Sequence, residues 1–303
     1  MENDQNIPHL EDHQEVPTLD PLVPLKVDSI IQQKNMSVDL FAFDSVGVRL
    51  YPERWGIVTS LRFGDTELLY QGMLDETLFD PTKSVKWGVP ILFPNAGPLT
   101  EEQQKKSGYT LPQHGFARDN SWNIETAVLD NQLLQSLSSE NVANTSGFPF
   151  SGNILNAISV IDRDTCLFEY FIRNKSENPL PIALGLHPYF DLPEWDKSLI
   201  EWNFDGGKQI RDEIEKWSNG GTTKIDIPSD GILDVYIPGI GDIHIEVSLD
   251  FQRLWIWSLP EKNFVCIEPV MGDSWTLVEA PVLVPPNSEH TSFMKISLRE
   301  MAI

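Results

Sequence analysis

The sequence predicts an all-β fold of antiparallel strands, arranged as a sandwich or a barrel. Its apolar residues fall in short runs that mix or alternate with polar residues, and Gly, Pro, Asp or Asn separate the runs. Long amphipathic helical patterns are scarce. Helices do not alternate with strands as in β-α-β units, so a parallel sheet is not indicated.

One domain and one extension account for the chain. With 303 residues, of which 41% are hydrophobic, the protein can bury a large core in a single β domain. Residues 1–35 are rich in Asp, Glu, Pro and Gln, and the first basic residue is Lys26. Such a composition does not repay the entropy of ordering, so we expect a disordered acidic extension followed by a domain over residues 36–303.

Strand-like runs follow one another through this domain. They cover residues 38–43, 47–52 and 56–63 near its start, and residues 166–174, 243–249, 254–259 and 291–298 further on. Between them, residues 101–107 and 137–152 read as loops or short helices, and residues 208–222 as a polar insertion.

Charge and cysteine content argue against several classes of protein. The 45 acidic and 22 basic residues give a net charge of −23, which repels nucleic acid and anionic membranes. The chain opens with no secretory signal, and no apolar run reaches the ~18 residues of a membrane span. Cys166 and Cys266 each lie in an apolar run, as buried free thiols do. We therefore expect a cytoplasmic protein with neither a nucleic-acid nor a membrane partner.

Two of the six histidines lie where a site could form. His114 precedes Gly115, which permits a tight turn, and His187 stands where a proline cuts an apolar run short. The remaining histidines fit structural or solvated positions; they are His9, His13, His244 and His290. Sequence motifs of nucleotide-binding loops and serine hydrolases do not occur.

Two carboxylates interrupt apolar runs. Glu268 follows F-V-C-I and precedes a proline, so its strand carries an acid where a core or rim position is expected. A buried carboxylate must be paired, hydrogen-bonded or raised in pKa, which makes Glu268 a candidate general base. A glutamate bonded to a neighbouring strand explains the same pattern equally well. Asp234, in G-I-L-D-V-Y-I, gives a weaker signal of the same kind.

Read together, these segments resemble the aldose 1-epimerase (galactose mutarotase-like) family, and in particular its branch of hexose-6-phosphate 1-epimerase-like proteins. The resemblance spans about residues 38–300, and the matching pieces run in family order. They are P-E-R-W-G-I-V-T-S-L (52–61), S-V-K-W-G-V-P-I-L-F-P-N-A-G (84–97), Q-H-G-F-A-R-D-N-S-W (113–122), L-G-L-H-P-Y-F (184–190), L-D-V-Y (233–236) and N-F-V-C-I-E-P (263–269).

The resemblance implies a large antiparallel β-sandwich, a supersandwich, that binds a sugar on its concave face. It implies that His187 is the general acid that protonates the ring oxygen, and that Glu268 is the general base that takes the anomeric hydroxyl proton. The resemblance also assigns residues to sugar binding, namely His114, Asp234, Arg118, Lys86 and Asn95. Lys86 stands in place of the family's usual arginine, and Trp87 replaces the glycine that follows it.

The expected reaction interconverts the α and β anomers of a hexose, and it needs no cofactor or metal. The expected partner is a small sugar, bound by a monomer or a weak homodimer. Acid and base should flank the anomeric carbon across a pocket one sugar ring wide, about 5–8 Å apart. Trp87, Trp122 and Trp257 are either core residues or a platform for the sugar ring.

Four alternatives stay open at this point. The substrate could be a hexose 6-phosphate, or the protein could bind carbohydrate without turnover. Glycoside hydrolysis would use two carboxylates, for which Asp234 and Glu268 are available. A metal-dependent β-barrel would use His114, His187 and Glu268, although their spacing is not that of a metal motif.

Overall fold

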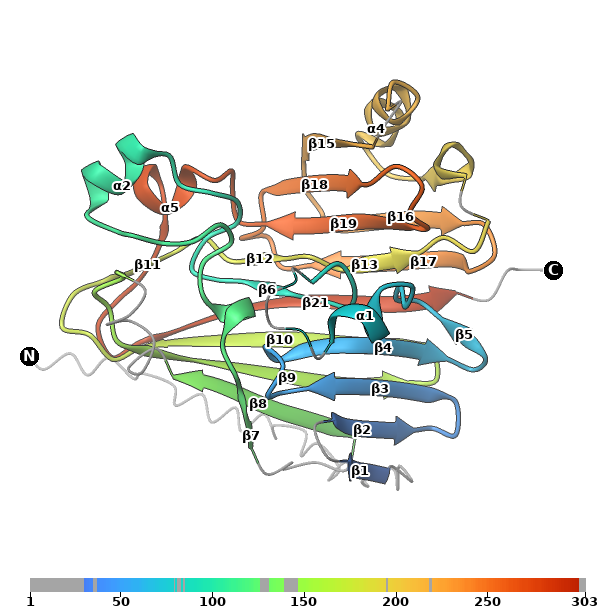
Figure 1. Cartoon of the computed structure of the whole chain (residues 1–303), viewed down its shortest axis with the longest axis horizontal. Coiled ribbons are helices and arrows are strands. Elements are labelled where there is room, and N and C mark those ends of the chain that lie inside the picture. The colour runs from blue at the N-terminus through green and yellow to red at the C-terminus, as the bar shows by residue number, and fades with distance from the viewer. Residues whose placement is uncertain are drawn as a thin grey trace, which may run out of the picture.

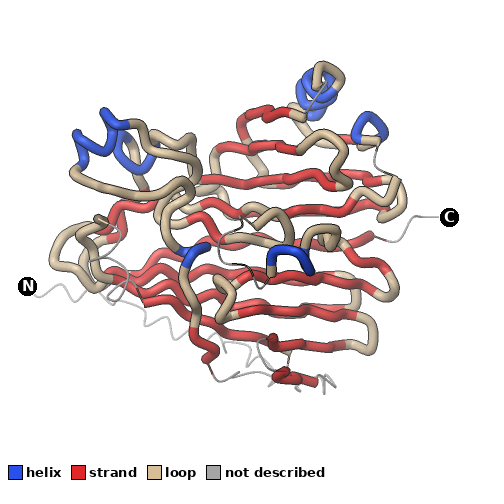
Figure 2. Tube along the Cα trace, in the orientation of Figure 1, coloured by secondary structure: helices blue, strands red, loops and turns tan. Residues whose placement is uncertain are grey.

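A computed structural model describes residues 30–34, 37–78, 80, 83, 85–125, 131–138, 147–194, 196–217 and 220–299. Strands are far more extensive than helices in this part of the chain, and the helices are short segments at the edges and over one face (Figure 2). Every pairing between its named strands is antiparallel. The all-β antiparallel sandwich expected from the sequence is therefore confirmed.

Three large sheets and one small one make up the fold (Figure 1). The five-stranded sheet contains β1 (Ile30–Lys34), β2 (Ser37–Ala42), β3 (Val46–Tyr51), β4 (Ile57–Phe63) and β5 (Thr66–Glu67), in that order. The eight-stranded sheet has the order β14 (Glu201–Trp202), β16 (Ile232–Ile237), β17 (Gly241–Val247), β21 (Glu289–Arg299), β10 (Thr165–Asn174), β9 (Gly152–Asp162), β8 (Gln132–Ser138) and β7 (Asn123–Glu125).

The six-stranded sheet carries the site described below. Its order is β15 (Gly221–Asp226), β18 (Arg253–Ser258), β19 (Phe264–Val270), β12 (Gly185–Leu186) and β6 (Ile91–Leu92), and β13 (Tyr189–Asp191) also pairs with β19. A small sheet pairs β11 (Leu180–Ile182) with β20 (Val282–Val284). Isolated bridges, Val58 to Val89 and Leu69 to Phe190, join the five-stranded sheet to the six-stranded one.

Alternation of side chains explains why the strands form and where they pack. In β10 every second residue is buried, so one face enters the core and the other stays half-exposed. The strands β8, β16 and β17 follow the same rule. By contrast, all seven residues of β19 are buried, because its two faces are both covered. Val265 and Ile267 face the main core, whereas Phe264 and Cys266 belong to a second apolar cluster.

The helices are short and cover edges. They are α1 (Leu74–Thr77), α2 (Glu101–Ser107), α4 (Gly207–Ile214), α5 (Thr276–Glu279) and the 3-10 turns Ala117–Asp119 and Lys197–Leu199. Thr100 caps α2 in a capping box with Gln103, and Gly108 ends it in the left-handed conformation. Lys106 of α2 bonds Glu279 of α5, and Figure 1 shows these helices side by side. None of the helices in the described ranges is long and apolar enough to cross a membrane.

Most predicted segments have the expected form, with some differences at their boundaries. The predicted extension, residues 1–35, lies outside the described residues except for β1, which pairs with β2. The folded part therefore reaches back to Ile30 at least, and not only to residue 36. Residues 101–107 form α2, and the polar insertion 208–222 contains most of α4 and the start of β15. Of the loop predicted at 137–152, residues 139–146 lie outside the described part.

Candidate active site

A patch on one face of the six-stranded sheet forms the floor of a pocket. Strand pairing places Gly185 opposite Val270 and Tyr189 opposite Cys266, so His187, midway between them, faces Glu268. The residues of neighbouring strands line up in two rows across the sheet. On the other side of β19, the strand β18 adds one residue to each row, and β15 adds one more. The first row is Lys224, Trp255, Glu268 and His187, and the second is Thr222, Trp257, Cys266 and Tyr189.

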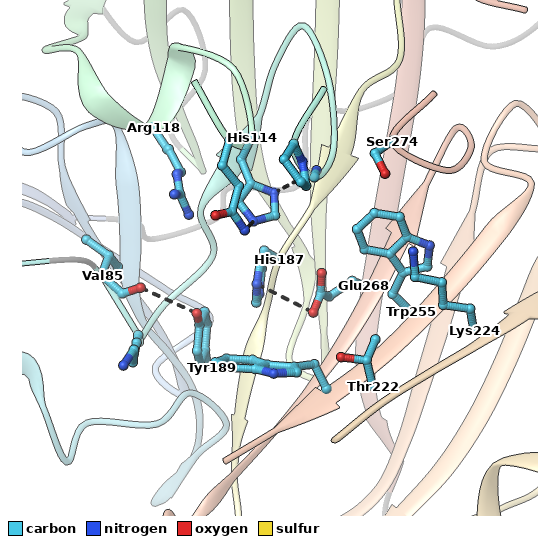
Figure 3. A pocket seen from close by; sticks show the side chains of 15 residues that line it. Val85, His114, Arg118, His187, Tyr189, Thr222, Lys224, Trp255, Glu268 and Ser274 are labelled. Carbon is cyan, nitrogen blue, oxygen red and sulfur yellow. Dashed lines mark hydrogen bonds and ion pairs between the residues drawn. The ribbon is translucent and has the colours of Figure 1, made fainter. Parts of the chain in front are cut away.

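His187 and Glu268 form a buried pair. The His187 Nε2 atom lies 3.5 Å from the Glu268 Oε1 atom, and the two side chains are 8% and 3% exposed (Figure 3). The sequence-based expectation was a separation of about 5–8 Å across the pocket. The two groups instead stand side by side on one floor, because neighbouring antiparallel strands hold directly opposed residues close together.

Burial moves the pKa values of this pair toward each other. Desolvation raises the pKa of Glu268 well above its ordinary value, although Lys224 and Arg118 oppose the shift by stabilising the carboxylate. For His187, desolvation lowers the pKa well below the ordinary value, and the nearby His114 and Arg118 act in the same direction. Both shifts disfavour the charged form, so burial alone favours a neutral imidazole beside a protonated carboxyl. The pair is thereby suited to exchange one proton through a bound molecule.

Aromatic rings surround the His187 imidazole. The Tyr189 ring stacks on it with centroids 4.7 Å apart and planes 5° apart, and Trp257 stands edge-on at 5.8 Å. His187 Nδ1 is buried and has no hydrogen-bond partner among the described residues. The Tyr189 hydroxyl donates to the Val85 carbonyl at 3.4 Å. Packing against rings, rather than a second hydrogen bond, therefore sets the orientation of this imidazole.

A tight loop brings His114 to the same pocket. His114 has a positive φ of 67°; its backbone N–H donates to the Gly97 carbonyl, and its Nδ1 accepts from the Gly97 N–H, both at 3.0 Å. Because Nδ1 is an acceptor, the neutral ring carries its hydrogen on Nε2; the Gln113 side-chain amide lies 3.1 Å away and accepts that hydrogen only through its oxygen. Burial lowers the pKa of His114 to about 3, so the ring stays neutral and its Nε2–H can donate.

Gly115 allows this loop to approach the sheet. Its φ is 68°, and a Cβ there would lie 2.0 Å from the Phe93 carbonyl oxygen. The same oxygen accepts hydrogen bonds from the N–H groups of Phe116 and Ala117. Only glycine fits so close an approach, and the loop is thus fixed with His114 above His187, their ring centroids 5.8 Å apart.

Of the residues predicted by resemblance to bind sugar, His114, Arg118 and Lys86 line the pocket. Asn95 does not: it is fully buried and donates from Nδ2 to the Gly97 carbonyl at 2.6 Å. It supports the turn that holds His114 and is not among the residues that line the pocket.

Asp234 does not join the pocket either. It lies on β16 of the eight-stranded sheet, where it accepts from His244 at 2.6 Å and pairs with Arg299 at 3.1 Å. The predicted contact of Asp234 with a sugar in this pocket is therefore not supported by the fold. Its strand belongs to a different sheet from the one that carries His187 and Glu268.

The pocket is positively charged although the chain is strongly acidic. Its cavity is about 400 Å³, and its charged lining consists of Lys86, Arg118, Lys224 and a single acid, Glu268. Lys224 lies over the Trp255 ring at 3.7 Å and reaches Asp273 at 3.3 Å. The Arg118 Nε atom is buried without a hydrogen-bond partner in the described part of the chain.

Sequence reasoning missed several residues of this pocket. Among the tryptophans it considered, Trp257 lines the pocket, whereas Trp87 and Trp122 are core residues. It did not identify Tyr189 or Trp255, both of which stand in apolar runs and give no signal of their own. Thr222 and Lys224 sit in a polar segment, and only the strand register brings them to the site, whereas Gln113 and Ser274 reach it from turns.

Comparison with known proteins gives the site a context. The sequence model of the aldose 1-epimerase family matches residues 84–229. The structure of the protein Slr1438 from Synechocystis sp. PCC 6803 is 25% identical, with a TM-score of 0.74 over 89% of this chain and 97% of that one. A galactose mutarotase-like protein from Clostridium acetobutylicum is 17% identical, with a TM-score of 0.71 over 90% of this chain and 99% of that one. A galactose mutarotase related enzyme from Lactobacillus acidophilus is 16% identical, with a TM-score of 0.60 over 90% and 97%.

No match is found among the curated proteins with which the sequence was compared. The sandwich of antiparallel sheets, with a polar pocket on one face, has the fold of solved galactose mutarotase-like proteins. The family match within this fold is more specific. It covers residues 84–229, just under half of the chain, and in this part the chain is similar to the aldose 1-epimerase family.

Proposed function

We propose that the protein is an aldose 1-epimerase that interconverts the α and β anomers of a hexose by acid–base ring opening. The observation that carries the proposal is the buried His187–Glu268 pair at 3.5 Å on the floor of a cavity of about 400 Å³. A pocket of this size holds one sugar ring. The family match supports a sugar as the substrate class.

The proposed chemistry needs only these two groups. In the ion-pair form of the two groups, the Glu268 carboxylate takes the proton of the O1 hydroxyl, the C1–O1 bond becomes a carbonyl, the C1–O5 bond breaks, and the His187 imidazolium gives its proton to O5. In the neutral form, which burial favours, the roles are exchanged: the His187 imidazole takes the O1 proton and the Glu268 carboxyl gives its proton to O5. Rotation about C1–C2 then exposes the other face of the aldehyde. Ring closure returns both protons, with the acid and base roles of the two groups reversed. O1 and O5 are bonded to one carbon, so an adjacent acid and base can reach both.

His114 has a supporting role in this reaction. Its ring is neutral at physiological pH, carries its hydrogen on Nε2 and lines the pocket, so it can donate a hydrogen bond to a sugar oxygen. Glycoside hydrolysis is less favoured. Of the described residues that line the pocket, Glu268 is the only acid, whereas hydrolysis ordinarily uses two carboxylates.

Exchange spectroscopy by NMR tests the proposal directly. On a panel of hexoses, wild type should accelerate α/β exchange above the spontaneous rate, and Glu268→Gln should lose about 10²–10⁴-fold of that acceleration. Glu246→Gln is the matched control, because Glu246 pairs with Lys295 on the eight-stranded sheet. If wild type and Glu268→Gln exchange every sugar equally, the proposal is wrong, and saturable binding would then indicate a carbohydrate-binding protein.

A second candidate is epimerisation of a hexose phosphate. Three cationic side chains line the pocket of a chain whose net charge is −23, and the Arg118 Nε atom is unpaired among the described residues. This arrangement favours an anionic substituent on the sugar. We expect kcat/KM for a hexose 6-phosphate to exceed that for the plain hexose at least tenfold. Added salt and Arg118→Ala should each shrink the advantage. Equal kcat/KM values for the two sugars would reject this candidate and leave the first one standing.

A further inference from the structure

Cys266 is a buried thiol on the strand that carries Glu268; it is not among the residues that line the cavity, and the proposed reaction does not use it. It lies on β19 two residues before Glu268, so the two side chains point to the same face of the sheet. One ligand atom from each of His187, Cys266 and Glu268 lies within 4.8 Å of the other two. All three side chains are buried, and Tyr189 and Trp257 stand across from Cys266 on the flanking strands.

This donor set matches the preference of a particular class of ion. An imidazole nitrogen, a thiolate and a carboxylate oxygen are ligands that Zn²⁺ accepts, whereas a thiolate does not suit Mg²⁺ or Ca²⁺. Tetrahedral ligands at about 2.1 Å from a metal lie about 3.4 Å from one another. The 3.5 Å between His187 Nε2 and Glu268 Oε1 agrees with that spacing. The cavity adjoins these two atoms, which leaves a fourth position for water.

We propose that a thiophilic divalent cation such as Zn²⁺ binds between His187, Cys266 and Glu268 and inhibits the protein. The ion displaces the thiol proton of Cys266, and the resulting thiolate and carboxylate together balance its charge. Lys224, the nearest lysine in the pocket, has an acidic partner in Asp273. The bound ion occupies the lone pairs of His187 and Glu268 that would otherwise accept protons during the reaction. Inhibition rests on the proposed epimerase function, but binding does not.

Cobalt is the probe that distinguishes this site from ordinary core packing of a cysteine. Titrating Co²⁺ into the full chain should give a near-ultraviolet thiolate-to-cobalt charge-transfer band that saturates at one ion per chain. Zn²⁺ should displace it and abolish anomer exchange. In Cys266→Ala the band should vanish, and the apparent Kd for Zn²⁺ should rise at least tenfold. Cys166→Ala is the matched control, because Cys166 is an equally buried free thiol on β10 of the eight-stranded sheet.

The outcomes separate the two proposals. Absence of the thiolate band in wild type overturns the metal site whether or not the variants fold. A band that persists in Cys266→Ala, or zinc inhibition of equal strength in wild type and Cys266→Ala, also overturns it. A saturating band lost only in Cys266→Ala supports the site. If that result accompanies no anomer exchange by metal-free wild type, the metal site stands and the epimerase proposal fails.

Discussion

At the scale of single residues, the site depends on an imidazole that is held without a second hydrogen bond. In many sites a carbonyl or carboxylate accepts from the far nitrogen of a catalytic histidine and fixes the ring. His187 Nδ1 has no such acceptor among the described residues, and the parallel Tyr189 ring 4.7 Å away takes over the task. A stacked ring fixes the plane of the imidazole while leaving its protonation free. It also favours the cationic form by a cation–π contact, against the effect of burial.

Removing the Tyr189 ring should therefore lower kcat more than it changes KM. Tyr189→Leu removes the stack, and a misplaced acid costs roughly 10–100-fold in kcat, or about 1.4–2.7 kcal/mol of transition-state free energy. Tyr189→Phe keeps the ring and loses only the 3.4 Å hydrogen bond to Val85, so its kcat should stay within about threefold of wild type. Steady-state kinetics and the NMR signals of the His187 ring measure both effects.

The NMR readout keeps this prediction independent of turnover. In Tyr189→Leu the His187 ring resonances should broaden or split, and the pKa of His187 should fall further because the favourable ring contact is lost. An unchanged His187 spectrum and unchanged kcat in a folded Tyr189→Leu variant would show that the stack does not position the imidazole.

At the scale of elements, the strands were predictable but their register was not. Alternation along residues 166–174 predicts β10 because the pattern of burial is a local property of the sequence. A similar local argument singled out Glu268 as an acid in an apolar run. Which residue stands opposite Glu268 depends on pairing between segments about 80 positions apart, and one residue of slippage would put every side chain on the other face. The sequence therefore indicates candidates, and only the fold makes them a pair.

The same reasoning explains the two misplaced binding residues. Asn95 and Asp234 were assigned to the sugar by resemblance, since each stands in a segment that matches the family. Asn95 is directed toward the Gly97 carbonyl, to which it donates a hydrogen bond, and Asp234 belongs to the eight-stranded sheet. Conversely, Lys224 lies in a polar segment with no motif, and the pairing of β15 with β18 brings it beside Trp255. Whether a polar residue belongs to a site therefore depends on which residues are its neighbours in the fold.

At the scale of the whole molecule, the charge of the pocket opposes the charge of the chain. The net charge is −23, yet the pocket lining holds three cationic side chains and one carboxylate. A negative surface keeps the molecule soluble and slows the approach of anions, whereas the local field at the pocket favours them once they arrive. Binding of an anionic sugar is therefore expected to become faster as salt screens the outer surface, while its affinity for the pocket falls.

The buried neutral histidines of the pocket also make the stability of the folded chain depend on pH. The pKa of His114 is about 3 in the folded chain and about 6.5 when unfolded. Above pH 6.5 the ring is neutral in both states, so its contribution to stability is complete. As pH falls from 6.5 toward 3, the unfolded chain binds a proton that the folded one does not, and stability is lost. Glu268 acts in the opposite sense, because its raised pKa lets the folded state bind a proton more tightly.

Replacing His114 isolates its contribution to the pH dependence of stability from the contributions of the other ionisable groups. Between pH 6.5 and 5, wild type should lose about 1.6 kcal/mol more unfolding free energy than His114→Asn, in urea titrations at each pH. Asparagine does not titrate, and its side-chain oxygen can still accept from the Gly97 N–H. The other ionisable groups remain in both proteins and cancel in the comparison, except that His187 loses the lowering of its pKa by His114. Parallel pH profiles for the two proteins would mean that water or a counterion reaches His114 in the folded state, and that its imidazole is not held as a neutral donor.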